Sequence, residues 1–131
     1  MSERKPVIKI YVKKKYIILN RPTIALLGNP PHLLFMFDEP NERLIILPAF
    51  EETLSTYEIP KYYWADKRQT CCICRLPFFL TLRQKLDWNG KKELYAFRGI
   101  FQILEKSQRL VIFYFTDADE IKINTKTQVQ V

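Results

Sequence analysis

Basic side chains near the start of the chain are the residues best suited to bind a ligand. They are Lys9, Lys13, Lys14, Lys15 and Arg21, with Lys5 before them. Because lysine and arginine neutralise phosphate groups, this segment predicts contacts with the backbone of DNA. Such contacts position a protein on DNA without reading its sequence. The alternative is a solvated hairpin turn, in which the lysines keep an edge strand from pairing with other chains.

A second, more scattered group of basic residues lies in the second half of the chain. Its members are Arg68, Arg75, Arg83, Lys85, Lys91 and Lys92. An arginine on a helix face can reach base edges in a groove of DNA, and Arg75 and Arg83 are the best candidates for such contacts. The alternative is ordinary solubilisation of the surface, since Lys91 and Lys92 flank a predicted turn.

Three consecutive aromatic residues, Tyr62, Tyr63 and Trp64, lie beside Lys61 and Lys67. Aromatic rings next to positive charges can stack on unpaired bases, which contributes about 1–3 kcal/mol per base where it occurs. No ribonucleoprotein motif accompanies these residues. We therefore expect the rings to anchor a connecting segment onto the core.

Cys71, Cys72 and Cys74 are candidates for metal binding or nucleophilic catalysis. They lack a second pair at zinc-finger spacing, and His32 is the only histidine, so we expect no metal site. A cysteine nucleophile needs a base within hydrogen-bonding distance, which His32 would have to supply from a distant part of the chain. The simpler expectation is a strand with Cys71 and Ile73 on one face and the other two cysteines on the opposite face.

Three carboxylates gather near the end of the chain, at Asp117, Asp119 and Glu120. Without a matching histidine or a glycine-rich loop they are a weak metal signal. We expect them to close the final strand or to offset the basic surface. The sequence therefore predicts no enzyme, no cofactor, no metal and no small-molecule substrate.

The composition limits the class of protein. The chain has 131 residues, of which 47% are hydrophobic and 14% aromatic, enough to bury a core. The formal charge of +7 favours an anionic partner such as DNA, anionic lipid or an acidic protein. The uncharged run over residues 22–37 is too broken by glycine and proline to span a bilayer. We expect a cytoplasmic protein without a signal peptide, and the odd, clustered cysteines agree.

Local patterns place the first basic group on a hairpin and a helix. Residues 7–19 are rich in β-branched and aromatic side chains around a lysine turn, which predicts two strands. Asn20 suits an N-cap, Pro22 a first helical turn, and Gly28 the position just beyond a helix, so we expect a helix over residues 21–27. The continuous apolar runs 33–37 and 44–47 predict a second hairpin whose strands are covered on both faces.

A looser version of this pattern follows a connector at residues 51–69. Residues 70–74 predict a strand, 78–86 a helix, and 93–104 with 109–115 a hairpin joined through residues 105–108. We interpret residues 1–50 and 70–121 as two related units, with chance similarity as the alternative. Residues 122–131 are expected to form a flexible tail.

The order of elements over residues 8–47 resembles the swapped-hairpin domain of the AbrB and MraZ transcription regulators. The resemblance is carried by residues 15–19, the helix end Leu-Leu-Gly at residues 26–28 and the hairpin at 33–47. It implies two units in one chain, interlocked into a barrel, and it implies DNA binding. Family members usually carry basic residues after the strand-connecting glycine and within the helix, whereas this chain has Tyr16, Ile24 and Ala25 at those approximate positions.

The overall interpretation is a mainly β (α+β) fold with short helices, made of two swapped-hairpin-like units that interlock within the chain or across a homodimer. The expected function is a small non-enzymatic DNA-binding transcription regulator. It would hold double-stranded DNA through Lys9, Lys13, Lys14, Lys15, Arg21, Arg75, Arg83 and Lys85. The alternative is a protein-interaction or structural adaptor that kept the scaffold without binding DNA, which the apolar positions Ile24 and Ala25 favour.

Overall fold

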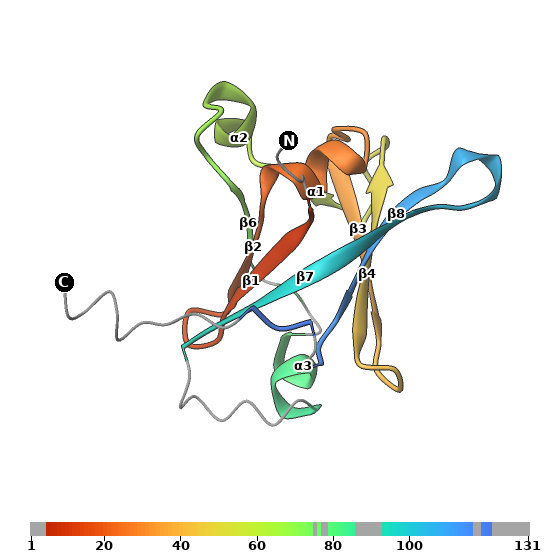
Figure 1. Cartoon of the computed structure of the whole chain (residues 1–131). Helices are drawn as coiled ribbons and strands as arrows, with labels where there is room; N and C mark the ends of the chain where they lie inside the picture. Colours follow the sequence, from red (N-terminus) through yellow and green to blue (C-terminus); the bar gives the residue numbers. More distant parts are fainter. Residues whose placement is uncertain (1–4, 75, 77–78, 86–92, 117–118, 122–131) are drawn as a thin grey trace.

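Eight antiparallel strands form one sheet that curls into a nearly closed, barrel-like shape, with short helices beside it (Figure 1). The computed structural model describes residues 5–74, 76, 79–85, 93–116 and 119–121. The expected class, mainly β with short helices, is confirmed. The predicted tail at residues 122–131 lies outside the described residues.

Along the described part of the chain, eight strands alternate with three short α-helices and one 3₁₀ turn. They are β1 (Val7–Tyr11), β2 (Tyr16–Leu19), α1 (Arg21–Leu26), β3 (His32–Asp38), β4 (Arg43–Ala49), β5 (Tyr57–Glu58), α2 (Lys61–Ala65), β6 (Cys71–Cys74), α3 (Phe79–Lys85), β7 (Leu94–Ile103), the 3₁₀ turn η1 (Glu105–Ser107) and β8 (Arg109–Tyr114). The three predicted hairpins, and the strand and helix before the third one, are confirmed within one or two residues. The connector at 51–69 contains β5 and α2, which the sequence did not predict.

Asn20 joins the first hairpin to α1. Its side-chain oxygen accepts hydrogen bonds from the backbone N–H groups of Thr23, at 3.2 Å, and of Val7, at 3.0 Å. One side chain therefore caps the helix and ties it to the start of β1. Gly28 adopts a φ of 90° beyond the helix, a conformation that glycine takes without steric cost, so the predicted stop is confirmed.

The strand pairing repeats itself when β1–β4 are exchanged with β5–β8. The sheet order is β5-β3-β4-β8-β7-β1-β2-β6. The exchange equates β1 with β5, β2 with β6, β3 with β7 and β4 with β8. The pairing of β1 with β7 then corresponds to the pairing of β5 with β3, and the pairings of β2 with β6 and of β4 with β8 each correspond to themselves. Only β1·β2 lacks a counterpart, since α2 lies between β5 and β6. Figure 1 shows the matching placement of α1 and α3 near opposite ends of the barrel.

β7 links the two parts of the sheet. Its first half pairs with β1, and its second half, from Gly99 onward, pairs with β8. A Cβ atom on Gly99 would lie 2.5 Å from the ring of Phe113, which is fully buried. The absence of a side chain is therefore required where the strand changes partner.

The barrel interior is apolar. The outer surface differs in chemistry between β3 and β4 on one side and β1 on the other. The interior includes Ile8, Ile10, Ile17, Leu19, Ile24, Leu27, Leu33, Leu44, Ile46, Val111 and Phe113, all fully buried. The expectation that β3 and β4 are covered on both faces is wrong within this chain, because only their inner face is buried. On the outer face Met36 keeps 56% of its surface exposed. The outer face of β1, by contrast, carries basic and tyrosine side chains.

Candidate nucleic-acid interface

The turn between β1 and β2 presents three lysines in succession. Lys13, Lys14 and Lys15 are all exposed, and their side chains form no ion pair with any residue that the structure describes. The N–H of Lys15 donates to the carbonyl oxygen of Tyr11 at 2.8 Å, and Lys15 adopts a φ of 61°. The turn is thus closed by the backbone, which leaves the ammonium groups available to solvent.

Two more basic side chains lie on the outer face: Lys9 in the middle of β1, and Arg98 of β7 beside Val7, at the end of β1 away from the turn. Because Ile8 and Ile10 are fully buried on the inner face, the alternation of a strand places Lys9 outside. Val7 pairs with Arg98 and Lys9 pairs with Ala96, so Lys9 and Arg98 are diagonal neighbours on one face.

We call Lys9, Lys13, Lys14, Lys15 and Arg98 the β1–β2 basic face. Arg98 was missed from sequence, because only the register of β7 against β1 brings it beside Lys9.

An aromatic pair lies between the turn and the rest of this face. Tyr11 and Tyr16 are directly paired across the hairpin, with ring centroids 4.9 Å apart. Both rings are half-buried and belong to the outer face. They provide an apolar surface next to the lysines without any candidate catalytic group.

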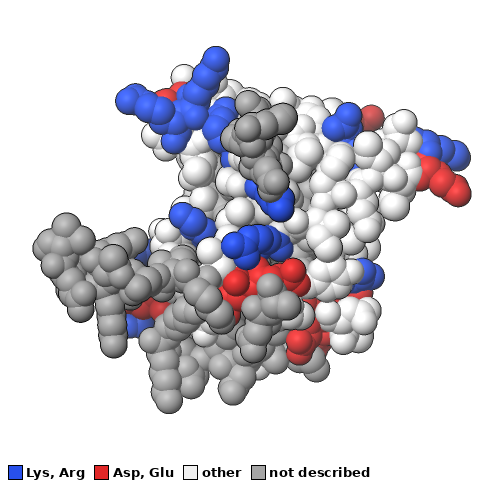
Figure 2. Space-filling view, viewed as in Figure 1, with Lys and Arg blue, Asp and Glu red and all other residues white. Residues whose placement is uncertain are grey.

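Acidic groups approach the far end of the basic face. The N–H of Arg98 donates to the carbonyl oxygen of Asp119 at 2.9 Å, and Glu120 forms a bridge with Phe97. Figure 2 shows positive side chains in the middle of the visible face with acidic side chains directly beside them, and a second positive group near α2. Both contacts of Arg98 and Phe97 are made by the backbone, so the expected offset of basic surface by Asp119 and Glu120 stays a prediction. Asp117 lies outside the described residues.

Arg21 occupies a different position from the lysines. It begins α1, at the end of the hairpin opposite to the turn. Its Nη1 donates to three carbonyl oxygens, of Gln69 at 2.8 Å, of Tyr63 at 3.2 Å and of Asp66 at 3.4 Å. The guanidinium also stacks 3.8 Å above the ring of Tyr63. Arg21 thus holds α2 and the segment after it against α1.

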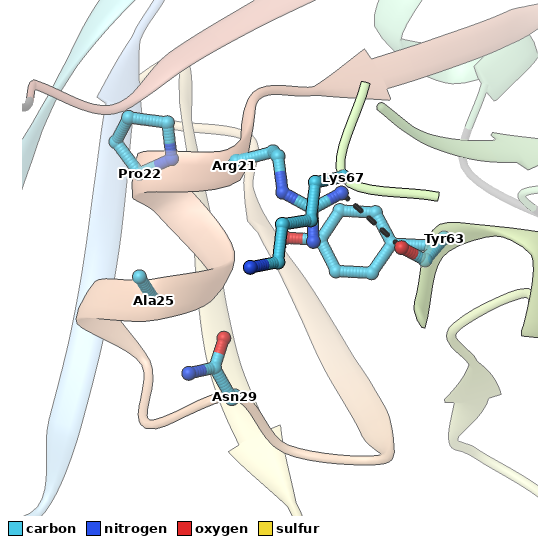
Figure 3. Close-up of a pocket in the computed structure, with 6 residues that line it drawn as sticks. All are labelled: Arg21, Pro22, Ala25, Asn29, Tyr63 and Lys67. Atoms are coloured by element: carbon cyan, nitrogen blue, oxygen red, sulfur yellow. Dashed lines mark hydrogen bonds between the residues drawn. The ribbon is translucent and has the colours of Figure 1, made fainter. Parts of the chain in front are cut away.

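A cavity of about 470 Å³ opens beside this arginine. Figure 3 shows its lining residues, with Arg21 and Lys67 at the Tyr63 ring and Ala25 and Asn29 across from them. Since Nη1 already has three acceptors, the arginine contributes mainly to structure here. The described lining residues of the cavity include no cysteine, serine, histidine or carboxylate.

The other predicted basic contacts are only partly placed. Arg83 and Lys85 belong to α3, and the positions of their side chains are not described. Arg75, Lys91 and Lys92 lie outside the described residues. Arg68 is exposed and pairs with Asp66 across 3.2 Å.

Of the three aromatic residues of α2, only Tyr63 enters the core as the sequence predicted, whereas Tyr62 and Trp64 each keep 44% of their surface exposed. Tyr63 is 1% exposed and packs edge-on against Trp64, with ring centroids 4.9 Å apart. The hydroxyl of Tyr62 accepts a hydrogen bond from the backbone N–H of Cys72 at 3.3 Å. These contacts attach α2 to β6.

The cysteines alternate across β6 as predicted. Cys71 and Ile73 are buried, whereas Cys72 is half-buried and Cys74 is exposed. Burial raises the pKa of the Cys71 thiol to about 12, so this group is a neutral core side chain at physiological pH. The described residues contain no group of three histidine, cysteine or acidic side chains able to hold a metal ion.

His32 begins β3 and pairs with Ala49 and Glu58. Its Nδ1 is buried and has no hydrogen-bond partner among the described residues.

Comparisons of the chain with protein-family models, curated proteins and solved structures find no match. The resemblance to AbrB and MraZ regulators therefore rests on the order of elements and the residues that carry it. Within the described part of the chain, no helix has the length and apolar character needed to cross a membrane.

Proposed function

We propose that this chain is a non-enzymatic DNA-binding regulator of the AbrB and MraZ type, which holds duplex DNA through the β1–β2 basic face. The observation that carries the proposal is the lysine turn. Three exposed ammonium groups follow one another at a hairpin tip, none of them paired with an acidic residue of the described chain. Lys9 and Arg98 extend the positive surface along the adjoining strands.

This arrangement suits phosphate contacts better than small-molecule chemistry. A protruding hairpin can follow a groove or a phosphate row, and each neutralised phosphate steepens the salt dependence of binding by about 0.9 in log K against log salt. Lysine makes point contacts that position a protein, so the proposed face supplies affinity more than sequence preference. The three free cysteines favour a reducing compartment, and we propose the cytoplasm.

The strand pairing supports the same class of protein. The resemblance implies two strand–helix–hairpin units interlocked as a barrel, and the pairing of β2 with β6 and of β4 with β8 joins the two halves of the chain in that manner. A pseudo-two-fold scaffold is a common basis for contacts with the two-fold backbone of DNA.

The test is binding of the purified protein to a mixed-sequence duplex, followed by fluorescence anisotropy over about 50–300 mM salt. A variant with Lys13, Lys14 and Lys15 changed to Gln should bind more weakly, with a slope smaller by about 2.7, since each phosphate contact contributes about 0.9. Gln removes the positive charge and keeps a polar side chain that is slightly shorter than lysine.

The matched control changes Lys61, Lys67 and Arg68 to Gln and removes the same formal charge near α2. All three residues are exposed. The control should keep most of the slope. Equal losses in the two variants would contradict the assignment to the hairpin, and an absence of binding at the lowest salt would overturn the proposed function.

One observation favours the second candidate, a protein-interaction module. Met36, Ile45, Ile112 and Ile100 are partners in register across β3, β4, β8 and β7, so they form one apolar row on the outer face. Met36 is 56% exposed and Ile100 is 45% exposed, whereas Ile112 between them is 5% exposed, so the row is open to solvent mainly at its two ends. The strand exchange maps Met36 onto Ile100 and Ile45 onto Ile112, which makes the row self-complementary. We propose a second copy of the chain as its occupant, which would form a homodimer.

The dimer is tested by light scattering coupled to size exclusion at several protein concentrations. Ile100→Asp should shift the mass toward the monomer, because a carboxylate would be buried in an apolar contact. Leu54→Asp is the control, since Leu54 is fully exposed elsewhere on the chain. A monomeric wild-type protein at all concentrations would remove this candidate.

A further inference from the structure

A second cavity, of about 340 Å³, lies where the β1–β2 turn meets the end of β6 and the start of α3. Its lining consists of Lys14, Lys15, Cys74, Leu76, Phe79 and Leu80. We call it the hairpin pocket. A volume of this size falls within the range of small-molecule sites, about 300–1,000 Å³.

The pocket combines an apolar floor with a cationic rim. Leu76 and Phe79 are 5% and 4% exposed, so they belong both to the core and to the cavity wall. Leu80, by contrast, is 58% exposed, which is a large apolar surface to leave in water. Lys14 and Lys15, both exposed, also line the pocket, and its described lining residues include no acidic side chain.

We propose that the hairpin pocket binds a small amphipathic anion, an apolar chain or ring system that ends in a carboxylate. A neutral apolar ligand would leave the two ammonium groups without a partner. A compact anion such as phosphate would leave the leucine and phenylalanine wall in water. A medium-chain fatty acid satisfies both parts, since its tail covers Leu76, Phe79 and Leu80 while its carboxylate meets the lysines.

Occupancy of the pocket has a consequence for the DNA site, and this step rests on the proposed function. Lys14 and Lys15 belong both to the pocket rim and to the β1–β2 basic face. A bound carboxylate neutralises charge that the phosphates of DNA would otherwise use, so the ligand and DNA compete. The hairpin pocket would thus be an effector site that releases the protein from DNA.

Cys74 supplies a direct readout, because its exposed thiol lines the pocket. The experiment measures the rate at which iodoacetamide alkylates Cys74 in a Cys72→Ser background, with decanoate as the ligand below its micelle concentration. Cys71 stays silent in the folded protein, because burial raises its pKa to about 12. Decanoate should slow the alkylation of Cys74 at least tenfold in a saturable manner, whereas 1-decanol, which lacks the charge, should not.

Two variants locate the effect. Leu80→Asp places a carboxylate on the exposed rim, where the fold tolerates it, and should weaken decanoate binding at least tenfold by repulsion. Leu54→Asp carries the same change at a fully exposed position that does not line the pocket, and should leave binding unchanged. Equal weakening by both variants, equal protection by 1-decanol, or attachment to phosphatidylglycerol vesicles without saturable decanoate binding would overturn the proposal.

Measurements of DNA binding with and without decanoate test the effector role separately from the proposed DNA-binding function. Decanoate should raise the apparent Kd for duplex DNA, and Leu80→Asp should remove that effect. Protection of Cys74 in a protein that does not bind DNA would support the pocket and overturn the regulator. DNA binding that saturating decanoate leaves unchanged would overturn the effector role.

Discussion

Replacement of Arg21 distinguishes a structural clamp from a DNA contact. Its Nη1 donates to three carbonyl oxygens at 2.8–3.4 Å, and its guanidinium lies 3.8 Å from the centroid of the Tyr63 ring. Hydrogen bonds to a charged group contribute about 1.5–3 kcal/mol each, and partial exposure reduces this by roughly half. If the two shorter bonds are counted and about 1 kcal/mol is added for stacking, Arg21→Ala should lower the free energy of unfolding by about 2.5–4 kcal/mol.

Arg21→Lys provides the matched comparison. Lysine keeps the charge and most of the stem, but it lacks the planar group that stacks on Tyr63 while donating to several acceptors. We expect about half of the loss seen with alanine. The assay is urea unfolding followed by far-ultraviolet circular dichroism and by tryptophan fluorescence, which reports on Trp64 beside the clamp.

The same variants must also be tested on DNA, at a temperature at which each remains folded. If Arg21 is structural, Arg21→Ala should leave the slope of log K for DNA binding against log salt unchanged. A loss of stability below about 0.5 kcal/mol, together with a slope smaller by about 0.9, would refute the argument and return Arg21 to the DNA-binding set.

Three further predictions concern the barrel itself. Gly99→Ala should destabilise the fold by about 1–3 kcal/mol in urea unfolding, because its Cβ would meet the Phe113 ring at 2.5 Å; Gly99→Ala with Phe113→Leu should lose less than the sum of the single changes. Hydrogen bonds from Asn41 and from Arg43 lower the pKa of Asp38 in the folded protein. The stability that this carboxylate contributes is therefore present above pH 3.8 and should be lost as the pH falls through the lowered pKa of the folded state. Arg43→Gln should reduce this acid-induced shift in the unfolding midpoint. Burial raises the pKa of Cys71 from 9.0 to about 12, so stability present below pH 9 should decline as pH rises toward 12, less steeply in Cys71→Ala.

The sequence predicted those elements whose signals are local. Asn20, Pro22 and Gly28 delimit α1 through capping, a fixed φ and a positive φ, and each effect acts within a few residues. The lysine turn and the alternation of Cys71 to Cys74 are local in the same sense. The elements β5 and α2 were missed, because β5 has two residues and α2 has no side-chain cap. What holds α2 is Arg21, some forty residues earlier in the chain.

The residues of the candidate site also fall into those that local patterns predict and those that only the three-dimensional fold brings together. Exposure of Lys9, Lys13 and Lys14 follows from alternation and from the turn, both of which can be read along one strand pair. Arg98 joins them through the register of β7 against β1, which no local pattern encodes. Membership of Arg21 in the DNA-binding set remains a prediction, and its three carbonyl acceptors favour a structural role.

The strand exchange explains why the proposed DNA face lies on one side only. The counterpart of the β1–β2 turn is the connection from β5 to β6, which also carries three basic residues, Lys61, Lys67 and Arg68. The first connection is a tight turn that presents its lysines from two paired strands. The second forms α2, which Arg21 ties to α1, and its Arg68 is paired with Asp66. Because Arg68 is paired with Asp66 whereas the turn lysines form no ion pair with a described residue, phosphate meets less competition from carboxylates at the turn, which should supply most of the salt dependence.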